Sequence, residues 1–248
     1  MNIVIALAVV LLLGGCGGGK ESPTAPTAPA PPTPTIVSVA VAITNEIILR
    51  GSSEMATATV TLSNGTTQPG TAALWNSENS AVASVDGSGR VTGNQSGRTT
   101  INYTAQGVGG SRNIRVVPSY TGSWSGSYIV RGCDQSGIFV TIRFCVDTFP
   151  TNRVLPTNLT LSQGTRDVVS GRFFLGQIQS DTFTAAIETD GAIQFSGVLR
   201  SGQFDIDSFW RINSLQDGRI VGALTQRWTS PGFSGQANVA SEVRDLNR

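Results

Sequence analysis

Two carboxylates, Asp205 and Asp207, have a spacing that suits acid–base chemistry or cation binding. Residues two apart on a β-strand point to the same face, so both side chains would meet one substrate or one ion. Phe209 continues the same parity and leaves the identity of that face open. The alternative, which we favour, is a solvated outer strand face on which the two aspartates do no chemistry.

The composition lacks the commonest catalytic groups. The chain has no histidine, which excludes a Ser-His-Asp triad and removes the commonest metal ligand. Trp124, Trp210 and Trp228, together with Tyr128, could line a sugar or apolar ligand site, but such residues more often fill a barrel interior. We therefore expect no enzyme, no catalytic residue, no metal site and no cofactor, and we assign no ligand-binding residue.

Cys133 and Cys145 are predicted to form a disulfide. An even pair of cysteines in an exported domain favours a disulfide. Closing a loop of this length would add about 3 kcal/mol to stability in the chain-entropy model. A metal pair is the weaker alternative because histidine is missing, and redox-active pairs usually have closer spacing.

The N-terminus predicts export. Residues Ile3 to Leu13 form an unbroken apolar run, about half of the roughly 20 residues that a membrane-spanning helix needs. Such a run suits the core of a secretory signal, although no Lys or Arg precedes it. Leu13-Gly14-Gly15-Cys16 resembles the bacterial lipobox. The resemblance implies cleavage after residue 15, lipidation of Cys16 with acyl chains such as palmitate, and sorting to the outer membrane. A plain secretory signal is the alternative.

A proline-rich tether is predicted for residues 16–35. Six prolines between Pro23 and Pro34 prevent both helix and sheet from propagating. A polyproline-like spacer rises about 3.1 Å per residue, so the segment could span up to roughly 60 Å. We interpret it as a generic lipoprotein linker without a ligand of its own.

Residues 36–118 predict a β-sandwich. Val37, Val39, Val41 and Ile43 alternate with smaller or polar residues, and the run from Ala56 to Leu62 alternates likewise. Turn signals such as Asn64-Gly65 and Asp86-Gly87 separate about seven short strands.

This domain resembles the bacterial Ig-like group 2 domains of invasin- and intimin-type surface proteins. The matching segments are Trp75-Asn76-Ser77-Glu78-Asn79, Val82-Ala83-Ser84-Val85-Asp86, Gly89-Arg90-Val91-Thr92-Gly93 and Gly97-Arg98-Thr99-Thr100-Ile101. The resemblance implies an adhesin module or a spacer. Trp75 is the expected plug of the core between the two sheets.

Residues 119–248 predict an antiparallel up-and-down β-barrel. Asp190-Gly191 and Asp217-Gly218 are hairpin signals between alternating stretches. Eight or nine hairpin-linked strands close most economically into a barrel without open edges. The expected strands lie near residues 123–131, 137–146, 155–162, 167–175, 181–188, 192–200, 203–213, 218–228 and 233–241.

The first barrel strand carries a short motif. Gly122-Ser123-Trp124 resembles the start of lipocalin and avidin-like (calycin) barrels, and the resemblance implies that Trp124 is a core residue at the closed end. Together the two domains give an all-β fold class, an Ig-like β-sandwich followed by a small antiparallel barrel.

Charge and motifs favour one function class over two others. A net charge of +1, with 13% charged residues, gives no concentrated basic face for nucleic acid. We expect an outer-membrane, lipid-anchored cell-envelope lipoprotein with a binding, adhesive or structural role. Its partners would be the membrane, through the anchor, and an envelope protein or glycan. A carrier of an apolar or sugar ligand is the alternative, and it requires an open cavity of about 300 Å³ or more. A hydrolase using Asp205 and Asp207 is the third hypothesis.

Overall fold

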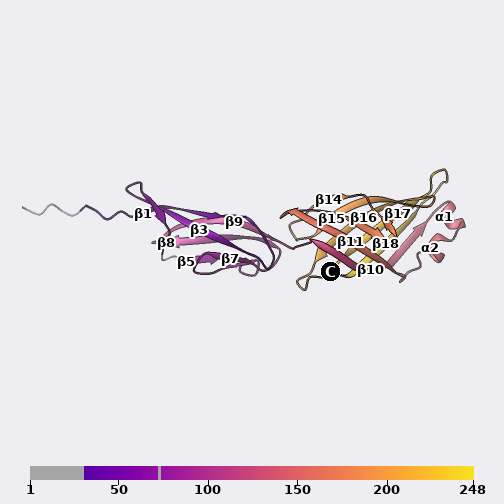
Figure 1. Ribbon diagram of the computed structural model, residues 1–248, viewed down its shortest axis with the longest axis horizontal. Coiled ribbons are helices and arrows are strands. Elements are labelled where there is room, and N and C mark those ends of the chain that lie inside the picture. The colour runs from indigo at the N-terminus through magenta and orange to yellow at the C-terminus, as the bar shows by residue number, and fades with distance from the viewer. Residues whose placement is uncertain (1–30, 72–73) are drawn as a thin grey trace, which may run out of the picture. The chain divides into compact units, whose positions relative to one another are not determined.

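The computed structural model describes residues 31–71 and 74–248, and the chain divides into the units Met1–Thr33 and Pro34–Arg248. The predicted signal peptide, Cys16 and most of the predicted tether lie outside the described residues. Everything below concerns the second unit, which holds two bodies of β-structure (Figure 1).

The first body is a sandwich of two sheets. One sheet has the order β1-β3-β7-β6, with β4 paired to β3, and the other has the order β2-β9-β8-β5. The strands are β1 (Ile36–Ile43), β2 (Ile47–Leu49), β3 (Ser53–Leu62), β4 (Thr67–Pro69), β5 (Leu74–Ser77), β6 (Ala83–Val85), β7 (Arg90–Gly93), β8 (Gly97–Ala105) and β9 (Val108–Val117).

Alternation in the sequence produces the inner faces of the sandwich. Ala56, Ala58 and Val60 of β3 are buried, whereas Thr57 and Thr59 between them are exposed. Trp75, expected as the central plug, is only partly buried and lies against two core clusters. The fully buried aromatic is Tyr103 on β8, which meets the Trp75 ring edge-on at 4.8 Å between centroids.

The second body is a nearly closed up-and-down barrel, as the alternation predicted. Its sheet has the order β13-β12-β11-β10-β18-β17-β16-β15, with β14 paired to β12. Its strands are β10 (Gly122–Gln135), β11 (Val154–Thr165), β12 (Val168–Leu175), β13 (Ile178–Gln179), β14 (Phe183–Ala186), β15 (Ile193–Ser201), β16 (Phe204–Ser214), β17 (Ile220–Thr229) and β18 (Ala237–Asn247).

Closure comes from pairing the first barrel strand with the last. β10 and β18 run antiparallel, with Tyr128 opposite Val243 and Val130 opposite Ser241. Tyr120, just before β10, is fully buried: its hydroxyl donates to the Gly191 carbonyl at 2.7 Å and accepts from the Ser214 amide at 3.2 Å. Burial raises the pKa of Tyr120, so the phenol stays neutral and keeps its donated proton.

One seam of the barrel is held by side chains rather than by a backbone ladder. Within the described residues, β14 and β15 are joined by the single bridge Ile187–Ile193 at their hairpin. Beyond it, Phe183 and Phe195 stack at 3.8 Å between ring centroids, with 4° between the ring planes. Phe195 also stacks on Trp210 at 5.7 Å. Aromatic stacking therefore replaces the missing strand pairing across the seam.

The predicted strand at 137–146 is wrong. This segment forms two short helices, α1 (Ile138–Thr141) and α2 (Phe144–Asp147). Its apolar residues do alternate, but Gly137 turns the chain with φ 54° and Arg143 adopts φ 52° between the helices. These bends let Phe139 and Phe144 both point inward, and that burial outweighs the local strand pattern.

Two other predicted strands have different bounds. The stretch predicted as 181–188 contains only the short β14, while the preceding β13 was not expected. The last strand, predicted near 233–241, runs from Ala237 to Asn247.

The seam yields a stability prediction. Phe195→Ala should lower the free energy of unfolding by about 3–5 kcal/mol, because the buried ring leaves both a cavity and an unclosed seam. Phe209→Ala is the control: Phe209 lies on the neighbouring strand but points outward and is 55% exposed, against 7% for Phe195. Its loss should change stability by no more than about 0.5 kcal/mol. Urea unfolding measures both, and similar losses for the two variants would contradict the role given to the stack.

Candidate functional site

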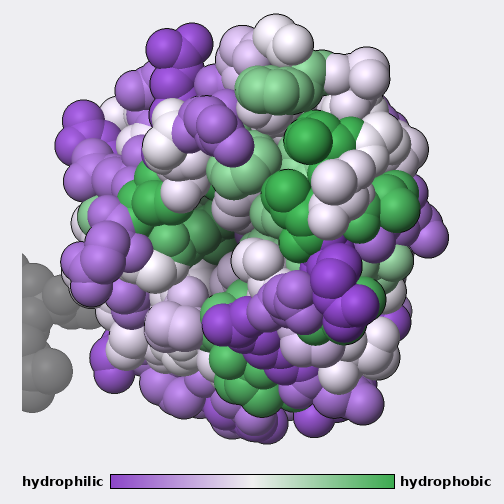
Figure 2. Space-filling view, turned by 90° about the vertical axis from the view of Figure 1, so that its right-hand side faces the viewer, coloured by the Kyte–Doolittle hydropathy of each residue, from purple (hydrophilic) through white to green (hydrophobic). Residues whose placement is uncertain are grey.

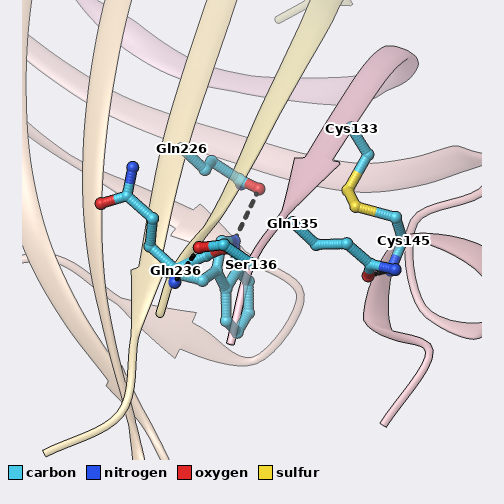
Figure 3. Close-up of a disulfide and its surroundings, with 7 residues drawn as sticks. Cys133, Gln135, Ser136, Cys145, Gln226 and Gln236 are labelled. Atoms are coloured by element: carbon cyan, nitrogen blue, oxygen red, sulfur yellow. Dashed lines mark hydrogen bonds between the residues drawn. A yellow bond between two sulfur atoms is a disulfide. The ribbon is translucent and has the colours of Figure 1, made fainter. Parts of the chain in front are cut away.

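The helical end of the barrel is the most distinctive local structure. Here α1 and α2 cross the barrel mouth between β10 and β11 (Figure 1). The Cys133–Cys145 disulfide joins β10 to α2, with 5.5 Å between the two Cα atoms. Next to it, the Cys145 amide donates to Gln135 Oε1 at 2.7 Å (Figure 3). The sequence predicted this disulfide from the cysteine count, and the structure forms it.

Two glycines allow the helical end to pack closely on the loop before β18. A Cβ atom on Gly137 would lie 2.1 Å from the Ser234 carbonyl oxygen. One on Gly235 would lie 2.3 Å from the Ser136 carbonyl oxygen, and both residues have positive φ. Ser136 and Gln236 also exchange hydrogen bonds at this crossing. Only glycine satisfies the space and the backbone conformation together.

The inner side of this end is an aromatic plug. Phe144 packs on Phe139 and on Trp228 with 5.1 Å between ring centroids in each case. Phe149 reaches Trp228 at 5.3 Å, and Phe204 lies beside them. This cluster fixes the position of the helices, so the outer side is presented on a rigid support.

The outer side of the same end is apolar. Four large side chains there are 43% to 56% exposed: Val140, Ile142, Val146 and Phe233. We call these four residues the apolar end patch. Figure 2 looks onto this end and shows hydrophobic side chains gathered among polar ones. The charges of α2 are locally balanced, because Arg143 pairs with Asp147 at 3.4 Å. Contact with a partner through this patch would therefore rest on apolar area and shape.

The two candidate carboxylates lie on the outer face of their strand, which is the alternative favoured from the sequence. Asp205 and Asp207 lie on the outer wall of β16, opposite in parity to the buried Ile206 and Ser208. Asp205 pairs with Arg200 at 3.0 Å, and Asp207 pairs with Arg227 at 2.5 Å. Each carboxylate is neutralised by its own arginine, so the two do not converge on one substrate. Among the described residues, no cluster of acidic, cysteine or histidine side chains could hold a metal ion.

The predicted aromatic residues lie inside the barrel. Trp124 is buried, its Nε1 donates to the Tyr120 carbonyl at 2.8 Å, and Arg248 covers its ring at 4.5 Å from the centroid. Trp210 packs among the rings of the seam, and Trp228 belongs to the plug. These contacts favour the filling role over the lining of a large apolar cavity, so the carrier alternative gains no support from the packing.

The polar side chains of the barrel interior were missed by sequence reasoning. Ser208, Gln226 and Ser241 are buried on β16, β17 and β18. Figure 3 shows Gln226 on the far side of Gln135 from the disulfide, and its Oε1 accepts from Trp228 Nε1 at 3.3 Å. Each of the three has inward-facing apolar residues two positions before and after it, so strand parity alone could have placed them inside.

Comparisons with known proteins identify the first body. Residues 36–116 match the model of the bacterial Ig-like domain (group 2). The sandwich is therefore similar to the bacterial Ig-like domains of group 2. Neither helix in the described part of the chain is long and apolar enough to cross a membrane.

Longer relatives share more of the chain at low identity. Ice-binding protein 1 of Shewanella frigidimarina is 27% identical over 214 residues, which are 86% of this chain and 20% of that protein. The chain thus spans about a fifth of that relative's length.

Two solved structures also resemble the chain. A mutant of intimin from EHEC O157:H7 shares 25% identity over 46% of this chain and 57% of its own, with a TM-score of 0.24. Domains 5–6 of the S-layer protein SbsC share 14% identity over 84% of this chain and 98% of theirs, with a TM-score of 0.29.

Proposed function

We propose that this protein is a lipid-anchored envelope protein that binds a partner without catalysing a reaction. The Ig-like domain, of an adhesion or structural type, supports a role outside the cytoplasm. The disulfide at the barrel mouth supports the same location, because such bonds persist in oxidising compartments. The anchor itself rests on the lipobox-like segment that ends at Cys16.

The apolar end patch is the proposed binding surface, and it is the observation that carries the binding role. Its four side chains expose apolar area on a support fixed by a disulfide, an aromatic plug and a glycine crossing. A rigid apolar surface loses little conformational entropy when it binds. Its locally balanced charge suits an envelope protein better than an anionic polymer.

The carboxylates on the outer wall do not support the hydrolase hypothesis. The filled interior does not support the hypothesis that the barrel carries a large apolar ligand. Asp205 and Asp207 are each occupied by an arginine, as described above. The rings of Phe144, Phe149 and Trp228 pack on one another inside the helical end of the barrel. Binding at the exterior of the barrel is therefore the stronger proposal.

The anchor is tested by the mass of the mature protein. We expect an N-terminus at Cys16 that carries a diacylglycerol group and an amide-linked acyl chain, measured by mass spectrometry of the membrane fraction. Cys16→Ala should abolish the acylated form. Recovery of the wild-type protein with an unmodified Cys16, or with residues 3–13 still attached, would contradict the anchor.

The binding surface is tested by photo-crosslinking in intact cells. A photoreactive residue in place of Val146 should form a discrete crosslinked product, because Val146 lies in the apolar end patch. The control is the same residue in place of Val198, which is similarly exposed but lies on the outer wall of β15. Equal crosslinking from both positions, or none from Val146, would contradict the proposed surface.

A further inference from the structure

The barrel core extends beyond the barrel into the sandwich. Both bodies belong to the one compact unit Pro34–Arg248. Ile47 and Leu49 of β2, a sandwich strand, pack against the cluster of buried residues that fills the barrel. Val117, the last residue of β9, is fully buried and belongs to the same cluster, and it is paired with Leu49. The sandwich therefore places an apolar end against the barrel mouth that lies opposite the helical end.

Arg50, directly after β2, reaches across to the barrel. Its guanidinium donates to the Ser214 carbonyl at 3.1 Å, to Ser214 Oγ at 3.2 Å and to the Leu215 carbonyl. Ser214 ends β16, so these acceptors lie at a fixed position on the barrel rim. Burial lowers the pKa of Arg50, which agrees with a guanidinium that is withdrawn from water at this contact. Because hydrogen bonds from a charged donor are stronger than those between neutral groups, Arg50 holds this side of the contact firmly.

Two further arginines cross between the bodies, one from each side. Arg115 on β9 donates to two successive carbonyls of the turn between β14 and β15, at 2.6 Å to that of Glu188. Arg166, in the turn between β11 and β12, donates to the Ile47 carbonyl at 2.9 Å and pairs with Glu54 of β3 at 2.7 Å. Most acceptors of the three arginines are backbone carbonyls, which have no side-chain rotamers. These contacts therefore oppose rotation of one body against the other.

The linker between the bodies is short and is held in place. Only residues 118–121 separate β9 from β10. Gln163 of β11 donates through Nε2 to the Pro118 carbonyl at 3.3 Å, and its Oε1 accepts from the Tyr120 amide at 3.0 Å. The side chain of Tyr120 is itself buried in the barrel core. The linker therefore leaves little freedom between the last strand of the sandwich and the first strand of the barrel.

Relative motion is the ordinary expectation for two domains that a linker joins. We propose that the sandwich instead closes the second mouth of the barrel, so that the two bodies form one rigid, cooperatively folded unit. The helices α1 and α2 cover one mouth, and β2 with its neighbouring arginine contacts covers the other. One consequence, which rests on the proposed binding function, is that the sandwich acts as a rigid spacer and presents the apolar end patch in a fixed direction.

Distances between the two bodies test the rigid unit. In the full chain, held in detergent, spin-labelled non-canonical residues replace Met55 on the sandwich and Val198 on the outer barrel wall, which are 49% and 56% exposed. These labels spare the native cysteines. Pulsed electron paramagnetic resonance should give one narrow distance distribution. Arg50→Ala combined with Arg166→Ala should broaden it, whereas the control Arg172→Ala removes only a contact within the barrel and should leave it unchanged.

Calorimetry of the same proteins gives a second measurement. The unsubstituted chain should unfold in a single transition, because the two bodies share one core. The double variant should lower the midpoint by about 5–10 °C, since it removes charged hydrogen bonds at the contact. Arg172→Ala should lower it by no more than about 2 °C.

Two results would overturn the proposal. The first is a broad or two-peaked distance distribution in the unsubstituted chain. The second is a double variant whose distribution and midpoint match those of Arg172→Ala. If the double variant does not fold, the distribution of the unsubstituted chain still decides. A narrow distribution without crosslinking from Val146 would contradict the binding surface and leave the rigid unit intact.

Discussion

The pairing of β10 with β18 is the constraint on which the rest of the barrel depends. It joins the strands that come first and last along the chain in the barrel, with Tyr128 opposite Val243. Once the sheet closes, every strand residue is committed to the inside or the outside. That commitment places the aromatic plug, the buried polar residues Ser208, Gln226 and Ser241, and the arginine-paired carboxylates. The closed sheet also leaves a single seam to be held by other means, and the Phe183–Phe195 stack holds it.

In the closed barrel, polar residues that are neighbours in the sequence lie on opposite sides of the sheet. On β16, Asp205 and Asp207 point outward to their arginines, while Ile206 and Ser208 point inward. Solvated carboxylates satisfied by arginine offer little for catalysis, and their ion pairs add little stability. A buried serine without a partner is costly and therefore informative. The outer wall thus carries ordinary surface charge, paired between aspartate and arginine.

Much of the fold follows from alternation, and the exceptions have physical causes. Period-two patterns predicted both the sandwich and the barrel, because each sheet has one buried face. The segment 137–146 also alternates, yet it forms helices, since burying Phe139 and Phe144 in the barrel mouth outweighs local preference. Trp75 was expected at the centre of the sandwich, but Tyr103 on a longer strand lies deeper. The size of a tryptophan side chain predicts that it is buried, but not how close to the centre of the core it lies.

The candidate sites were less predictable than the fold. Cysteine count predicted the disulfide, but nothing local showed that it would fasten helices over a barrel mouth. The exposure of Val140, Ile142 and Val146 depends on the direction in which the plug points, which is a tertiary property. Ser208, Gln226 and Ser241 could have been assigned to the interior from parity. Their missing partners could not, because hydrogen bonding across strands depends on register and side-chain reach.

Residue-resolved amide hydrogen exchange under native conditions tests the closed barrel most directly. If β10 and β18 close the sheet, the amides that link them, around Val130 and Val243, should be among the slowest to exchange. Amides of β15 that face the seam should exchange faster than those bonded to β16. Fast exchange along both β10 and β18, as on the free edges of an open sheet, would contradict the account.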